Sequence, residues 1–127
     1  MKNLPLKIAG VISFLTALIH TFGGQKDLID PLQESNMSYQ STMEIIGTWH
    51  LVTILLFGTA FFLLKFGFRG YGRSNHNLLR AIGWIYIAGS VPYIAVSFKY
   101  GLLAPQFILL LPIGILIHWN LKYYKTI

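Results

Sequence analysis

Two histidines are the residues best placed for chemistry in this chain of 127 residues, because each lies within a long apolar stretch. His20 is near the end of one stretch and His50 is inside the next. Polar side chains at membrane depth are energetically unfavourable, so those found there often mark functional positions. No Asp, Glu, Lys or Arg lies near the middle of these stretches, which disfavours a proton-coupled transporter.

Other polar side chains recur at helical spacing on the apolar stretches and predict a shared inward face. One such series comprises Tyr86, Ser90, Tyr93 and Ser97. Small and hydroxylic residues at this spacing allow membrane helices to pack closely. We expect a polar pocket that opens toward the outer side of the membrane. Its predicted lining is His20, His50, Tyr93, Ser97 and Gln106, with Glu44 at its mouth.

The predicted pocket could hold a metal ion, a haem or a small hydrophobic molecule such as a quinone. His20 and His50 are the candidate ligands of a transition metal. Zinc binds three or four protein ligands, so Glu44 would have to supply a third. The two imidazoles could instead be axial ligands of haem b. The alternative is that both histidines only form hydrogen bonds between helices.

The sequence leaves open whether the chain is an enzyme. A binding or accessory role is favoured. A histidine base would also suit a membrane oxidoreductase or a lipid-modifying enzyme. A third class is a structural subunit, either of a larger membrane complex or of a homo-oligomer. The chain contains no cysteine, which excludes disulfides, thiol nucleophiles and zinc–cysteine sites.

The elements that must position these residues are apolar helices. The chain is 54% hydrophobic and only 11% charged, which is too few charges to coat a soluble globule of this size. About 20 apolar residues cross a bilayer as a helix. Four stretches qualify, at about residues 5–22, 43–64, 78–98 and 104–121. We therefore predict an all-α integral membrane bundle of four transmembrane helices, forming a single domain over residues 1–127.

The predicted helix boundaries follow from local residue chemistry. Gly23 and Gly24 favour a helix stop, because glycine readily adopts the left-handed cap conformation. Asp30 and Pro31 favour one short helical turn in the connection that follows. Ser41 and Glu44 match a capping box, in which the serine caps the second span and the glutamate bonds back to it.

Basic residues are distributed unevenly along the chain. Lys and Arg collect on the cytoplasmic side of membrane proteins. With four spans, only Lys26 and Lys99 fall on the side opposite the other eight. This split predicts that both termini are cytoplasmic, in a multi-pass protein of a bacterial inner membrane. The net charge of +6 then reflects topology and contact with the lipid bilayer, and no nucleic-acid partner is expected.

Two short segments carry a resemblance to known proteins. They are His20-Thr21-Phe22-Gly23-Gly24 and Trp49-His50-Leu51-Val52-Thr53. Together with the number of spans, they resemble the pattern of uncharacterised small four-helix bacterial integral membrane proteins. The resemblance implies an architecture and no particular activity.

Overall fold

The computed structural model describes residues 3–124 and is helical, with no strand among those residues. The long helices are α1 (Leu4–Gly24), α3 (Tyr39–Arg69), α4 (His76–Tyr100) and α5 (Gln106–Tyr124). The short ones are the π-helical turn η1 (Gln25–Ile29), α2 (Asp30–Gln33) and the 3-10 turn η2 (Arg73–Asn75). The predicted all-α class with four long helices is confirmed.

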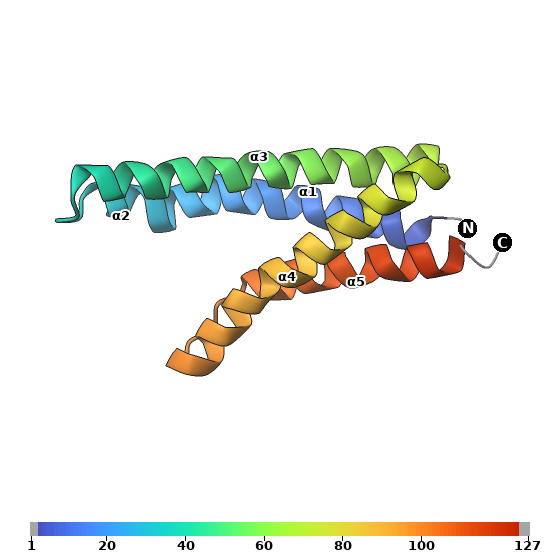
Figure 1. Ribbon diagram of the computed structural model, residues 1–127. Helices are drawn as coiled ribbons and strands as arrows, with labels where there is room; N and C mark the ends of the chain where they lie inside the picture. The colour runs from blue at the N-terminus through green and yellow to red at the C-terminus, as the bar shows by residue number, and fades with distance from the viewer. Residues whose placement is uncertain (1–2, 125–127) are drawn as a thin grey trace.

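Two helical hairpins make up the molecule (Figure 1). The first pairs α1 with α3, which runs antiparallel to it, and the second pairs α4 with α5. α5 also packs against α1 and thereby joins the hairpins. The start of α1 and the end of α5 lie near each other, and α4 runs from that region obliquely away from the α1–α3 pair.

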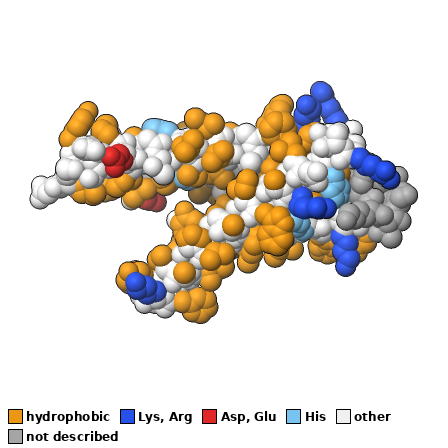
Figure 2. Space-filling view, viewed as in Figure 1, with side chains coloured by type: hydrophobic (Ala, Val, Ile, Leu, Met, Phe, Trp, Pro, Cys, Tyr) orange, Lys and Arg blue, Asp and Glu red, His pale blue; other side chains and the backbone are white. Residues whose placement is uncertain are grey.

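The two ends of the molecule differ in charge. We call the end that holds the start of α1 and the last turn of α5 the basic end, because most cations of the described residues gather there (Figure 2). They are Lys7, Lys65, Arg69, Arg73, Arg80 and Lys122. The opposite end of the α1–α3 pair, at residues 25–44, is the distal end. It carries all the acidic residues, Asp27, Asp30, Glu34 and Glu44.

Within residues 3–124, three helical segments are long and apolar enough to cross a membrane: Leu4–Gln33, Tyr39–Arg69 and Arg73–Tyr100. α5 is not among them, so the fourth span stays a prediction. At 1.5 Å per residue, the 31 residues of α3 extend about 46 Å, beyond the roughly 30 Å of a hydrocarbon core. The polar distal end of the α1–α3 pair would therefore emerge from the apolar layer.

A polar contact at the centre fixes how the hairpins meet. The hydroxyl of Tyr86 in α4 forms hydrogen bonds with the Ser13 hydroxyl of α1 and, at 2.7 Å, with the Thr59 hydroxyl of α3. Ser13 and Tyr86 are buried. Because each hydroxyl has a partner, this contact removes the penalty of burying polar groups among apolar side chains.

Glycines permit the closest approaches between helices. A Cβ on Gly114 of α5 would lie 2.8 Å from the Gly83 carbonyl oxygen and 3.1 Å from the Ile87 nitrogen, both in the α4 backbone. Backbone atoms cannot move aside as a flexible side chain can. By contrast, a Cβ on Gly58 of α3 would meet nothing within 4 Å.

We therefore expect Gly114→Ala to destabilise the fold by about 1–3 kcal/mol, the usual cost of overpacking. Gly58→Ala is the matched control and should be neutral or slightly stabilising, because alanine favours the helix. Denaturant unfolding of both variants in the same detergent gives the comparison. Equal stability of the two would contradict the close α4–α5 packing.

Two predicted boundaries are wrong. The helix does not stop at Gly23 and Gly24 but continues through η1 into α2, which forms the predicted turn at Asp30. Gly24 serves packing instead, since a Cβ there would lie 1.8 Å from the Trp49 ring. α3 begins at Tyr39 with Ser38 as its N-cap, so the capping box at Ser41 and Glu44 is wrong.

The N-cap of α3 lies three residues before the predicted one. The Ser38 hydroxyl oxygen accepts a hydrogen bond from the Ser41 backbone N–H at 3.2 Å. Glu44 lies inside the helix, where its carboxylate accepts a hydrogen bond from the Gln40 side chain at 3.1 Å. The predicted N-cap was too late in the chain because it was placed next to the apolar run that begins at Met43. A serine can cap a helix before the apolar run begins, as Ser38 does here.

Candidate functional site

The molecule is hollowed between the distal half of the α1–α3 pair and the far end of α4. Figure 2 shows this hollow as an open wedge between two apolar arms. Its apex is the contact of Tyr86 with Ser13 and Thr59, because these three hydroxyls are where α4 meets α1 and α3. The helices diverge beyond that contact (Figure 1).

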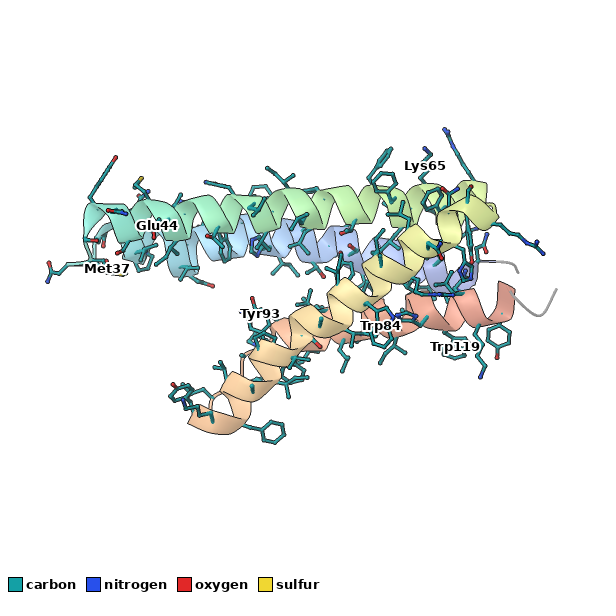
Figure 3. The ribbon with its side chains drawn as sticks, viewed as in Figure 1. Met37, Glu44, Lys65, Trp84, Tyr93 and Trp119 are labelled. Atoms are coloured by element: carbon teal, nitrogen blue, oxygen red, sulfur yellow. The ribbon has the colours of Figure 1, made fainter. Side chains whose placement is uncertain are left out.

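Helical phase identifies the side chains that border the wedge. His20 lies seven residues after Ser13 in α1, and Tyr93 lies seven residues after Tyr86 in α4. Seven residues are close to two full helical turns and a rise of about 10 Å. His20 and Tyr93 are therefore on the helix faces that meet at the apex, each about two turns farther out. Figure 3 shows Tyr93 on the side of α4 that faces the α1–α3 pair.

His20 is held by the neighbouring helix α3. Its ring stacks on that of Trp49, with the ring centroids 3.7 Å apart and the planes 14° from parallel. Its Nε2 atom lies 3.4 Å from the Trp49 carbonyl oxygen. Trp49 also packs over Gly24 of α1. The stack fixes the imidazole and leaves Nδ1 as the nitrogen that can contact a ligand.

His50 does not share this position. It lies at the level of His20, next to Trp49, but its side chain is exposed. His50 precedes Thr59 by nine residues, or about two and a half helical turns, which places it on the opposite side of α3. Because Thr59 faces α4, His50 faces away from the wedge. No hydrogen bond or ring contact joins the two histidines within residues 3–124.

The remaining predicted pocket residues are separated. The Ser97 hydroxyl donates to the Tyr93 carbonyl oxygen at 2.8 Å and accepts from the Ala104 N–H at 3.0 Å, so it ties the end of α4 to the turn before α5. Gln106 is exposed in the first turn of α5. Glu44 is exposed at the distal end of α3. The structure therefore brings only His20 and Tyr93 to the two facing sides of the wedge.

The donor set fits a hydrogen-bonded ligand better than a metal ion. Among the described residues, no group of three or more His, Cys, Asp or Glu side chains is close enough to hold a metal ion. The two candidate haem ligands also face different sides of α3. An imidazole and a phenol across an apolar gap can instead bind a molecule that has a polar head and an apolar body.

Sequence reasoning missed Trp49, Thr59 and Gly24 as parts of this region. Of these residues, the sequence assigns a structural role to Gly24, as part of the predicted helix stop. One sequence signal could have linked Gly24 with Trp49. A glycine and a large aromatic residue that lie at the same depth on two antiparallel helices can pack against each other. Thr59 lies between Gly58 and Ala60 in an apolar part of α3, and nothing in its spacing singles it out from the other threonines of that helix.

Comparison with protein families, with curated proteins and with solved structures gives no match for this chain.

Proposed function

We propose that this chain is a multi-pass membrane protein that binds a small amphipathic ligand of the quinone type in the wedge. The observation that carries the proposal is the wedge itself (Figure 2), with Tyr93 on one side (Figure 3) and His20, by its helical phase, on the other. It retains two residues of the predicted pocket and excludes His50, which faces away. A quinone is one of the ligands that the sequence favours.

The chemistry of the two side chains suits such a head group. Nε2 of His20 faces the Trp49 carbonyl oxygen, so it donates there, and Nδ1 is then a hydrogen-bond acceptor. A hydroquinone hydroxyl can donate to that nitrogen, and a quinone carbonyl oxygen can accept from the Tyr93 hydroxyl. Val52, seven residues before Thr59, adds an apolar side chain on the α3 side for the ring or tail.

The proposed orientation follows the charge distribution. With the basic end in the cytoplasm, the wedge opens in the outer half of a bacterial inner membrane. An apolar ligand could then enter sideways from the bilayer without crossing water. The fourth span, α5, belongs to this proposal because it returns the chain to the basic end.

The test is a titration with a short-chain benzoquinone, which quenches tryptophan fluorescence. Trp84 and Trp119 lie on α4 and α5 toward the basic end, so a Trp84→Phe/Trp119→Phe background leaves Trp49 as the reporter. We expect saturable quenching, and Tyr93→Phe should weaken binding about fivefold through the loss of one hydrogen bond. Quenching that never saturates, or that Tyr93→Phe leaves unchanged, would contradict the proposal.

A further inference from the structure

A second candidate site lies at the opposite end of the molecule from the wedge mouth. It is an open groove of about 690 Å³ between the last turns of α3 and the turn that leads into α4. We call it the basic groove. Among the residues that line it are Phe62, Lys65, Phe66, Arg69, Asn75 and Leu78.

The lining of the basic groove has two chemical parts. Lys65 and Arg69 are four residues apart in α3 and therefore lie on one face of its last turns. Phe62 and Phe66 flank these cations one turn back, and Leu78 of α4 borders the groove. Cations beside an apolar wall match a molecule in which an anionic group is joined to hydrocarbon.

The cations of the groove lack a protein counter-charge. Every acidic residue of the chain lies between residues 27 and 44, at the distal end. No ion pair within the described residues involves Lys65 or Arg69. Lys65 makes a cation–π contact instead, with its Nζ 6.0 Å from the centroid of the Phe61 ring. Within the described residues, the groove therefore holds two cations and no anion.

The expected depth of the groove in the membrane indicates which kind of anion could bind there. Twenty helical residues span the roughly 30 Å of a hydrocarbon core, and Lys65 lies twenty residues from Ile45, just inside the polar distal end of α3. Lys65 and Arg69 are then at the boundary between hydrocarbon and headgroups. Phosphate groups of lipids lie at that level, with their acyl chains beside the apolar layer.

We propose that the basic groove is a binding site for one anionic phospholipid, with the phosphate at Lys65 and Arg69 and an acyl chain along Phe62, Phe66 and Leu78. This differs from general attraction to a charged membrane. Arg73 and Arg80 lie at the same end and are exposed, yet they do not line the groove. They provide a matched control that removes the same charge from the same side.

The experiment uses the purified full-length chain in phosphatidylcholine nanodiscs that contain a minor fraction of phosphatidylglycerol. Native mass spectrometry then counts the phosphatidylglycerol that the protein retains. A Lys65→Gln/Arg69→Gln variant should lose retention by roughly 30-fold, or about fivefold for each cation near the headgroups. Arg73→Gln/Arg80→Gln should retain the lipid as the unmodified chain does.

Two results would overturn the assignment. One is an equal loss in both double variants, because that would mean nonspecific attraction to surface charge. The other is displacement of phosphatidylglycerol by millimolar inorganic phosphate, because that would mean a site for free anions. Helix content by circular dichroism checks that the glutamine variants are folded, and Arg69→Lys, which keeps the charge, should retain most of the lipid.

Discussion

Replacing His20 by alanine is expected to weaken binding of the hydroquinone form of the ligand roughly tenfold or more, whereas replacing His50 should leave it unchanged. The difference follows from position, since His20 stacks on Trp49 at the wedge and His50 is exposed on the far side of α3. His20→Ala removes a hydrogen-bond acceptor and leaves a polar ligand group unpaired in an apolar setting. His50→Ala removes an imidazole that faces away.

The two histidines make a matched pair, because they are the same residue type at the same level of adjacent helices. The measurement is the dissociation constant of a short-chain benzohydroquinone, kept reduced by excess dithionite, for each variant by isothermal titration calorimetry. His20→Ala also removes the stacked ring and should cost about 1 kcal/mol of stability, so thermal unfolding is measured alongside. Equal losses of affinity in both variants would restore the predicted pocket shared by the two histidines.

Cysteines placed at Asn36 and Ser74 are expected to react with a membrane-impermeant maleimide from opposite sides of the membrane. Both positions are exposed, the first in the connection between α2 and α3 and the second in η2. α3 separates them and is long and apolar enough to span. The effect should be all or none, because a reagent that cannot cross the bilayer reaches only one side.

The chain suits this labelling because it has no cysteine of its own, so each variant carries a single reactive thiol. In intact cells Asn36→Cys should label and Ser74→Cys should not, and lysis should expose Ser74→Cys. Labelling of Ser74→Cys alone in intact cells would reverse the orientation. Labelling of both would contradict the span between them.

The long helices were predictable because apolar runs of this length have few alternatives. The predicted stretch at residues 43–64 lies within α3, and that at residues 78–98 lies within α4. Helix ends were harder to predict, because the apolar run ends before the helix does. α3 therefore begins four residues before the predicted span, at Tyr39, and ends five residues after it, at Arg69.

The site was predictable only in part. The helical spacing of the sequence correctly placed Tyr86 and Tyr93 on one face of α4. It could not reveal that this face is buried at Tyr86 and exposed at Tyr93. That difference arises because α4 crosses α1 and α3 obliquely, meets them at the Tyr86 hydroxyl and diverges from them beyond it. The predicted depth in the membrane is similar for His20 and His50, which is why the sequence analysis placed them in one pocket. In the structure the two side chains point in different directions from α1 and α3, so they do not meet.

Photoaffinity mapping tests the central claim, that the ligand lies in the wedge, most directly. A benzoquinone with a short diazirine tail is irradiated with the purified chain in nanodiscs, and the labelled residues are located by peptide mass spectrometry. Labels should concentrate between residues 14 and 24 of α1 and between residues 86 and 97 of α4, and excess unlabelled quinone should suppress them. Suppressible labels confined to the side of α3 that carries His50, with none near His20 or Tyr93, would contradict the account.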